Sequence, residues 1–274
     1  MWLDIIIDVK DTVMTDYKNL FNLKGKRAVV IGGGGGIGGA VAEGFAAVGV
    51  KTAIVGRSAD RLKKQVDNIM SKCGAAVEFF AADCSSEDAV AELYADVVAK
   101  FGGVDILVNS QGINKKFSAL EHPVADWDEM FEANVRSIML TCKFFGRYMK
   151  EQRYGRIINI SSIGAVRSKQ SDISVCYGST KGAVNAYSLN LAAGWAEHGI
   201  TVNSIAPIMT ETEMMKPIFE KNPELLTGTI ARVPAGRICT PEDCAGLAIF
   251  FASDAAEFIT GQILYPDGGL SLLQ

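Results

Sequence analysis

Short apolar runs of strand length alternate along this chain with longer stretches of helical pattern. The strand-like runs cover residues 27–32, 51–56, 76–83, 104–110, 156–162 and 200–207, and helical patterns such as 36–49 and 58–74 separate them. Near-continuous apolar strands that are separated by helices form a parallel sheet covered by helices on both faces. The sequence therefore predicts the α/β class, with one doubly wound parallel sheet.

The 274 residues show one compositional regime and contain no linker, which indicates a single domain. We expect residues 23–274 to form this domain and residues 1–22 to be an N-terminal extension, either an arm on a neighbouring subunit or a frayed terminus. Residues 208–236 contain no clear strand. We interpret them as a small helical lid over a substrate site.

Composition argues against several classes of partner. A net charge of −4 and a pI near 5.4 leave no broad basic field, so we expect no nucleic-acid partner. Six scattered cysteines and two histidines fit no zinc spacing, so no metal site is predicted. The chain shows no signal peptide and no apolar run of membrane-spanning length. Together with the unpaired thiols, this predicts a cytoplasmic protein.

Seven glycines lie within residues 32–39, directly after the first predicted strand. They fit the dinucleotide pattern G-x-G-x-x-G in two registers, Gly33/Gly35/Gly38 and Gly34/Gly36/Gly39. At a strand-to-helix turn, backbone N–H groups and the helix dipole suit a pyrophosphate. A tight turn without a ligand is the alternative interpretation.

The segment "YGSTK" places Tyr177 and Lys181 one above the other on a helix. An adjacent ammonium lowers the pKa of a phenol, which can then exchange a proton with an alcohol or a carbonyl. The strand at 156–162 ends in Ser161 and Ser162, at the sheet edge where ligands bind in such folds. A hydroxyl there can bond a reacting oxygen or simply cap the next turn.

These motifs, together with "NSQG" at 109–112 and "NV" at 134–135, occur in an order that resembles the short-chain dehydrogenase/reductase (SDR) family. The resemblance runs from about Leu23 to Leu270 and includes "GQILYPDGG" at 261–269. It implies a Rossmann-type fold, a nicotinamide cofactor, and interconversion of a secondary alcohol and a ketone. A non-catalytic dinucleotide sensor would need the glycine turn but not the tyrosine, serine and lysine.

The resemblance implies four catalytic residues, Asn134, Ser162, Tyr177 and Lys181. Tyr177 would be the general acid/base, and Ser162 would orient the substrate oxygen. Lys181 would bind the nicotinamide ribose and lower the pKa of Tyr177, while Asn134 would hold a proton-relay water. Ser161 stays an alternative to Ser162, since 15 residues from Ser162 to Tyr177 is a longer gap than is common in the family.

The family's glycine pattern selects Gly32, Gly36 and Gly38 and makes Gly33–Gly35 variable positions. It also implies that Asp83 contacts the adenine region and that Asn109 stands beside the cofactor. Ile208 replaces the family's usual glycine and would narrow the nicotinamide pocket. The complete predicted cofactor set is Gly32, Gly34, Gly35, Gly36, Ile37, Gly38, Arg57, Ser58, Asp83, Cys84, Asn109, Gln111, Gly112, Tyr177, Lys181, Pro207, Ile208, Thr210 and Thr212.

The end of the second predicted strand bears on the choice of cofactor. An acidic residue there favours NAD, but this chain has Gly56 followed by Arg57. A guanidinium can pair with the 2′-phosphate of NADP, so we favour NADP over NAD. A solvated Arg57 would leave NAD open.

Two loops near Ser162 and Tyr177 carry pairs of cations, Lys115 with Lys116 and Arg167 with Lys169. Such clusters suit carboxylate or phosphate substrates. Solvated cations on the two loops are the alternative interpretation. The predicted substrate-contacting residues are Asn114, Lys115, Lys116, Ser162, Arg167 and Met214.

Within the family, the chain looks most like members that act on sugar acids and polyols, such as gluconate 5-dehydrogenases. The methionine-rich segment 207–226 forms an adaptable apolar surface, which we interpret as packing over the nicotinamide. It could also cover a steroid or an acyl chain, so a hydroxysteroid dehydrogenase and a 3-oxoacyl-thioester reductase are the alternatives. The resemblance also suggests a homotetramer or a homodimer, with helices around 134–151 and 177–197 at its interfaces.

Overall fold

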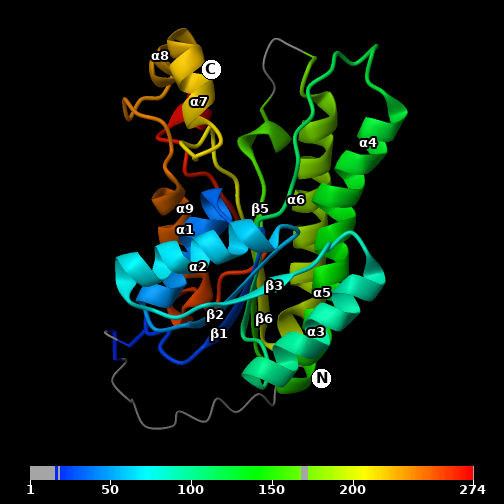
Figure 1. Cartoon of the computed structure of the whole chain (residues 1–274), viewed down its shortest axis with the longest axis vertical. Coiled ribbons are helices and arrows are strands. Elements are labelled where there is room, and N and C mark those ends of the chain that lie inside the picture. The colour runs from blue at the N-terminus through cyan, green and yellow to red at the C-terminus, as the bar shows by residue number, and fades with distance from the viewer. Residues whose placement is uncertain (1–15, 18, 168–171, 274) are drawn as a thin grey trace, which may run out of the picture.

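The computed structural model describes residues 16–17, 19–167 and 172–273. Its centre is a seven-stranded parallel sheet in the order β3-β2-β1-β4-β5-β6-β7 (Figure 1). The strands are β1 (Arg27–Ile31), β2 (Lys51–Gly56), β3 (Glu78–Ala81), β4 (Ile106–Asn109), β5 (Gly155–Ile160), β6 (Ile200–Ile205) and β7 (Ile263–Leu264). The predicted doubly wound parallel sheet is confirmed.

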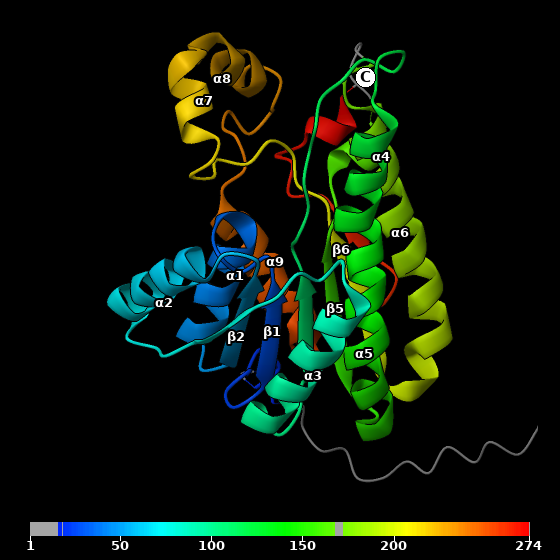
Figure 2. The same ribbon diagram turned by 45° about the vertical axis from the view of Figure 1, so that its right-hand side comes forward.

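Helices cover both faces of the sheet, as the views in Figures 1 and 2 show. They are α1 (Gly36–Ala47), α2 (Ala59–Cys73), α3 (Glu87–Phe101), α4 (Val124–Phe131), α5 (Ser137–Gln152), α6 (Val175–Trp195), α7 (Lys216–Lys221), α8 (Pro223–Ile230) and α9 (Pro241–Ala252). Helix α4 leads directly into a π-helical turn, η1 (Glu132–Arg136), which is followed at once by α5.

Alternate residues of each strand enter two separate hydrophobic cores. Val30 and Ile54 pack with α1, α2 and α9, whereas Val29 and Val55 pack with α3, α5 and α6. All four side chains are fully buried. This two-sided burial explains why the strands read as continuous apolar runs in the sequence.

The chain reverses its direction of winding between β1 and β4, which lie side by side in the sheet. In open α/β sheets, ligands bind beyond the carboxyl ends of the strands at such a switch point. The glycine turn after β1 and the segment after β4 both lie there. The fold therefore brings the predicted cofactor residues to one edge.

Element boundaries differ from the sequence prediction mainly at strand ends. The strands predicted at 76–83, 104–110, 156–162 and 200–207 are one to four residues shorter in the structure, and each ends one or two residues before its predicted end. The two-residue strand β7 was not predicted, since so short an apolar run carries no periodicity. No helix within the described ranges has both the length and the apolar character that a membrane crossing requires.

The segment predicted to be a helical lid contains two short helices, α7 and α8. Figure 2 shows them beyond the carboxyl ends of the strands, above α1 and α9. The end of the N-terminal extension contacts α9, where the rings of Phe21 and Phe250 lie 6.5 Å apart. Residues 1–15, which carry most of the predicted extension, lie outside the described residues.

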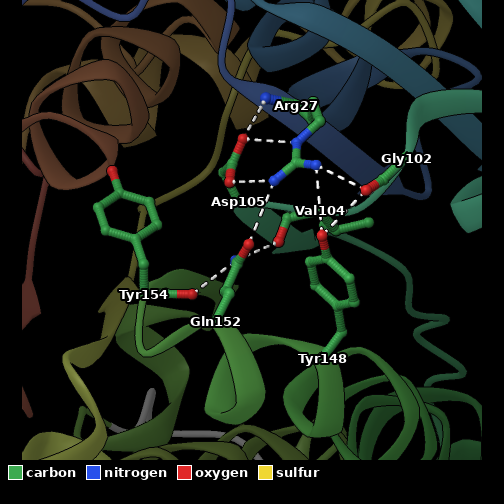
Figure 3. A network of polar contacts seen from close by, with 7 residues as sticks. All are labelled: Arg27, Gly102, Val104, Asp105, Tyr148, Gln152 and Tyr154. Atoms are coloured by element: carbon green, nitrogen blue, oxygen red, sulfur yellow. Dashed lines mark hydrogen bonds and ion pairs between the residues drawn. The ribbon is translucent and has the colours of Figure 1, made fainter.

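An ionic network closes the opposite, amino-terminal edge of the sheet (Figure 3). Arg27 donates two hydrogen bonds to the carboxylate of Asp105, with Nη2–Oδ1 2.7 Å and Nε–Oδ2 2.9 Å, and a third to the carbonyl of Gly102. Gln152 joins α5 to this network through the carbonyl of Val104. Burial alone would raise the pKa of Asp105, but the hydrogen bonds from Arg27 outweigh it and hold that pKa below its usual range.

We expect Asp105→Asn to lower the free energy of unfolding by about 3 kcal/mol at neutral pH, because it leaves a half-buried guanidinium without its counter-charge. Since the folded-state pKa is depressed, the contribution is present above about pH 4 and is lost as the pH falls through the folded-state value. Urea unfolding at a series of pH values checks this. Asp67→Asn, on the exposed face of α2, is the control, and an equal loss in both variants would contradict the assignment.

Candidate active site

Ser162, Tyr177 and Lys181 come together at the carboxyl edge of the sheet, although β5 and α6 contribute them separately. Ser162 follows β5 and caps the short helix Ile163–Ala165, accepting a hydrogen bond from the N–H of Gly164. Tyr177 lies in the first turn of α6, and its hydroxyl is hydrogen-bonded to that of Ser162. The alternative serine, Ser161, is buried, and its hydroxyl donates to the backbone of α6.

Lys181 lies one turn further along α6, and its side chain is almost fully buried. Its Nζ donates to the carbonyl of Ile160 at 2.8 Å and lies 5.7 Å from the centre of the Tyr177 ring. Burial lowers the pKa of Lys181 to about 8. Its ammonium can therefore give up or regain a proton near neutral pH.

The expected lowering of the Tyr177 pKa is not found in this structure. Burial raises the pKa of Tyr177, and the hydrogen bond from Ser162, rather than the charge of Lys181, works in the opposite direction. The physical reason is that Lys181 is itself desolvated and directs its Nζ at a backbone carbonyl.

The side chain of Asn134 is fixed by a hydrogen-bonded clamp. It sits in the π-helical turn η1, fully buried, and exchanges two hydrogen bonds with the backbone of Ile113, at 2.7 and 2.9 Å. Its second amide hydrogen goes to Oγ1 of Thr180 at 3.0 Å, and Thr180 donates to the carbonyl of Tyr177 at 2.8 Å. Both amide hydrogens of Asn134 are therefore used, so its side chain positions the segment after β4 against the catalytic helix.

Sequence reasoning missed Thr180, although the quoted "YGSTK" contains it. The available signal was a hydroxyl residue directly before Lys181 on the inward face of the helix. Thr180 is fully buried and links Asn134 to Tyr177.

We expect Thr180→Val to reduce kcat about tenfold, because a buried amide hydrogen of Asn134 loses its acceptor at a cost of about 1–3 kcal/mol. Thr180→Ser, which keeps the hydroxyl, should restore at least half of the activity. Steady-state kinetics and thermal unfolding of both variants check this. Equal kinetics for the valine and serine variants would contradict the role of the hydroxyl.

The glycine turn leaves little room at several positions. A Cβ on Gly32 would lie 2.7 Å from the backbone of Ser110, and one on Gly38 would lie 2.4 Å from the carbonyl oxygen of Gly32. Both are backbone contacts that cannot move aside. The turn after β1 is thus pressed against the segment after β4, which agrees with the assignment of Gly32 and Gly38.

The prediction that Gly33–Gly35 are variable is wrong at two of the three positions. A Cβ on Gly33 would lie 2.7 Å from the Cβ of Ile54, and Gly35 has a φ of +144°, which side chains rarely adopt. Gly34 has ordinary van der Waals distances to its neighbours. A close contact or a positive φ therefore favours glycine at four of the five consecutive positions, and Gly34 is the exception.

The turn fits a bound anion. Helix α1 begins at Gly36, and its first turn, residues 36–39, carries no acidic side chain, so its N–H groups and dipole face the turn unopposed. Thr212 lies against Gly36, with its Cγ2 3.6 Å from the position of an added Cβ. Within the described part of the chain, Oγ1 of Thr212 and Oε1 of Gln111 are buried without a hydrogen-bond partner. These are groups that a dinucleotide could satisfy.

Other predicted cofactor residues lie around the same edge. Arg57 and Ser58 are exposed at the end of β2, where Ser58 caps α2. Two hydrogen bonds from Ser85 lower the pKa of Asp83, with a smaller contribution from the charge of Arg57. Gly112 lies close to Asn134 and Lys181. A Cβ added to Gly112 would lie 3.1 Å from Oδ1 of Asn134.

Three predicted cofactor residues have side chains that face the protein interior. Asn109 is fully buried, donates to Asn159 at 2.9 Å and accepts from Thr141 at 2.7 Å, so its side chain braces β4 against β5. Cys84 belongs to the core, and burial raises its pKa to about 12. Ile208 is buried in the other core, so its side chain is used in packing.

The predicted cluster of substrate-binding cations is not what the structure shows. Lys115 pairs with both Asp126 and Glu129 of α4, and Arg167 donates to the carbonyls of Leu270 and Leu273. Lys169 lies outside the described residues. Lys116, Asn114 and Met214 are exposed, and Lys116 has no ion-pair partner among residues 16–17, 19–167 and 172–273.

Comparison with known proteins agrees with this geometry. Residues 32–271 match a family model described as enoyl-(acyl carrier protein) reductase. A curated relative, galactitol 2-dehydrogenase (L-tagatose-forming) of Cereibacter sphaeroides, is 36% identical and covers 94% of this chain and 99% of its own length. The chain belongs to the short-chain dehydrogenase/reductase family. It is an oxidoreductase that acts on CH–OH groups, with a nicotinamide dinucleotide as cofactor.

Two further SDR proteins show the range of the similarity. The 3-oxoacyl-[acyl-carrier-protein] reductase of Aquifex aeolicus is 31% identical and covers 90% of this chain and 98% of its own. A solved structure of a gluconate 5-dehydrogenase from Burkholderia cenocepacia, in complex with NADP and tartrate, has a TM-score of 0.86 and 30% identity. It covers 93% of this chain and 99% of its own.

Proposed function

We propose that this SDR enzyme interconverts a secondary alcohol and a ketone on a polyol or a sugar acid, with NADP as the preferred cofactor. The observation that carries the proposal is the contact between Ser162 and Tyr177, one helical turn from a buried Lys181 and at the same edge of the sheet as the glycine turn. The similarity to a galactitol 2-dehydrogenase and a gluconate 5-dehydrogenase supports the substrate class.

In the direction of oxidation, Tyr177 accepts the hydroxyl proton of the substrate, and Ser162 holds the same oxygen by a hydrogen bond. Lys181, whose Nζ lies 5.7 Å from the centre of the Tyr177 ring, would bind the ribose of the cofactor. When bound, the cofactor would supply the acceptor for the substrate's hydride. Gly32, Gly36, Gly38 and Thr212 would hold it, and Asn134 keeps the segment after β4 in register with α6.

The preference for NADP rests on Arg57. It is exposed directly after β2, where a 2′-phosphate would need a cation, and the end of that strand carries Gly56 instead of an acid. The NADP in the similar gluconate 5-dehydrogenase structure supports this assignment.

We expect Arg57→Ala to lower kcat/KM for NADP about tenfold, equivalent to about 1.4 kcal/mol, and to leave the value for NAD within twofold. Lys63→Ala on the exposed face of α2 removes the same charge nearby and is the control. A parallel loss for NAD and NADP, or no loss for either, would refute the role of Arg57.

An acyl substrate is the second candidate, because α7 and the residues just before it expose apolar side chains. Met214 is 73% exposed and Ile218 is 40% exposed. Such side chains can cover a long acyl chain or a steroid, and the similarity to a 3-oxoacyl-[acyl-carrier-protein] reductase favours the former.

A nicotinamide absorbance assay decides between these candidates. The purified enzyme is supplied with galactitol, gluconate, a hydroxysteroid or a 3-oxoacyl thioester, each with NAD(H) and NADP(H). The proposal predicts the highest kcat/KM for a polyol or a sugar acid. A preference for the thioester or the steroid of more than about tenfold would replace it.

We further propose a cytoplasmic homotetramer or homodimer. Phe258 is fully exposed, and Leu189 and Leu264 are partly exposed near the edge strand β7. An exposed apolar strip beside a sheet edge supports association with a second copy. Analytical ultracentrifugation tests this part of the proposal, and a monomer at micromolar concentration would refute it.

A further inference from the structure

Two buried cysteines face each other at the start of α9. The sulfur atoms of Cys239 and Cys244 lie 4.0 Å apart, and both thiols are free in this structure. Cys239 is 4% exposed and Cys244 is fully buried. A disulfide needs a separation of about 2.05 Å, so the two sulfur atoms would have to approach by about 2 Å.

Cys239 is one of the residues that line the wall of a pocket of about 360 Å³. Arg237, Asp243 and Tyr265 provide the polar part of this wall. Arg237 and Asp243 form a two-pronged ion pair, with N–O distances of 2.6 and 2.8 Å. The pocket is large enough to admit a small oxidant beside Cys239, because one water molecule takes up about 30 Å³.

The surroundings of the pair make the two thiols unequal. The hydrogen bond with Cys244 lowers the pKa of Cys239, burial opposes this, and Thr210 adds a smaller lowering. The same contact and burial raise the pKa of Cys244. Cys239 is therefore the thiol that forms the nucleophilic thiolate more readily, and Cys244 is placed to react second.

Cys239 is also tied to the loop that faces the cofactor turn. It forms a parallel bridge with Thr210, and its carbonyl accepts the N–H of Glu211 at 2.8 Å. Thr212, two residues after Thr210, lies against Gly36. The bridge between Thr210 and Cys239 joins the two ends of the segment that contains α7 and α8. A displacement of Cys239 would thus move Thr210 and Thr212.

We propose that Cys239 and Cys244 form a peroxide-sensitive thiol pair, which oxidises to a disulfide and weakens cofactor binding. The thiolate of Cys239 attacks hydrogen peroxide, so that an S–O bond forms, the O–O bond breaks, and the released hydroxide leaves as water after protonation. The sulfur of Cys244 then attacks Cys239, an S–S bond forms, and the sulfenic oxygen leaves as a second water. The two thiols lose two electrons together, and the peroxide gains them.

The test treats the intact enzyme with hydrogen peroxide and maps its peptides by mass spectrometry without reduction. We expect a peptide that links Cys239 to Cys244 and has lost two hydrogens, and its return to the free thiols with dithiothreitol. Cys244→Ser should stop at the sulfenic acid of Cys239, which dimedone traps. Cys239→Ser should leave Cys244 unmodified, while Cys73→Ser, which alters the half-buried thiol on α2, should leave the disulfide unchanged.

The second readout is the dissociation constant for NADP, which we expect to rise at least tenfold on oxidation and to recover on reduction. This readout rests on the proposed cofactor site, but the peptide map does not, so the two proposals fail separately. Oxidation of Cys73 without a Cys239–Cys244 link would overturn the thiol pair. A disulfide that leaves NADP affinity within twofold would overturn its effect on the cofactor loop.

Discussion

A Tyr177→Phe variant should bind the nicotinamide cofactor as the wild type does but turn over about 10³-fold more slowly. General acid/base catalysis by a positioned side chain contributes about 10²–10⁴-fold, and phenylalanine removes only the hydroxyl that exchanges the proton. The ring stays in place in the first turn of α6, where it lies over Lys181. The variant therefore separates chemistry from folding and from cofactor binding.

Steady-state kinetics give the turnover of this variant, and fluorescence titration of NADPH gives its affinity. Ser161→Ala is the comparison, because Ser161 lies next to the site but directs its hydroxyl at the backbone of α6. We expect Ser161→Ala to keep kcat within about threefold. Retention of more than a tenth of wild-type turnover by Tyr177→Phe would remove Tyr177 from the proposed chemistry.

The second large effect is expected at the glycine turn. Gly38→Val should raise the dissociation constant for the cofactor at least 100-fold, because its Cβ would lie 2.4 Å from the carbonyl oxygen of Gly32 and 3.1 Å from the Cβ of Ser110. The carbonyl group of Gly32 belongs to the backbone and cannot move without shifting the turn between β1 and α1. Isothermal titration with NADP measures the change.

Gly246→Ala is the matched control for this prediction. Gly246 lies in α9, and no atom would come within 4 Å of its added Cβ. Alanine there should leave cofactor affinity unchanged and stabilise the helix by about 0.5–1 kcal/mol. Unaltered NADP affinity in Gly38→Val would show that the turn does not hold the cofactor.

The parts of the site that follow from local geometry could be predicted from the sequence. The spacing of Tyr177 and Lys181 places them on one helical face wherever α6 goes, and the strand before Ser162 fixes the edge at which it lies. The parallel sheet followed from the alternation of strands and helices, because that alternation leaves few other ways to bury both faces.

The errors concern residues whose partners are distant in the chain. Lys115 was expected to bind substrate, but Asp126 and Glu129 neutralise it, and no spacing rule gives that pairing. The guanidinium of Arg167 donates hydrogen bonds to the carbonyls of Leu270 and Leu273, about 100 residues later in the chain. A cation in a loop is visible in a sequence, whereas its counter-charge depends on the folded packing.

Crowding around the backbone of the glycine turn could not be predicted from the sequence either. The family pattern made Gly33 variable, yet Ile54 of the neighbouring strand occupies the space of a side chain there. The pKa of Tyr177 was expected to fall, but burial raises it, and burial is a property of the whole fold. Sequence motifs identified which residues meet, and the structure shows how each is held.

Transfer of a labelled hydride from substrate to cofactor is the decisive measurement for the proposed reaction. The best alcohol from the substrate assay is prepared with deuterium on its carbinol carbon and incubated with the enzyme and NADP. Mass spectrometry then follows the reduced cofactor. We predict that NADPH carries the deuterium with the wild type and that Tyr177→Phe forms almost none. Ketone formation without deuterium on the nicotinamide, or no reduced cofactor from any alcohol, would contradict the assigned reaction.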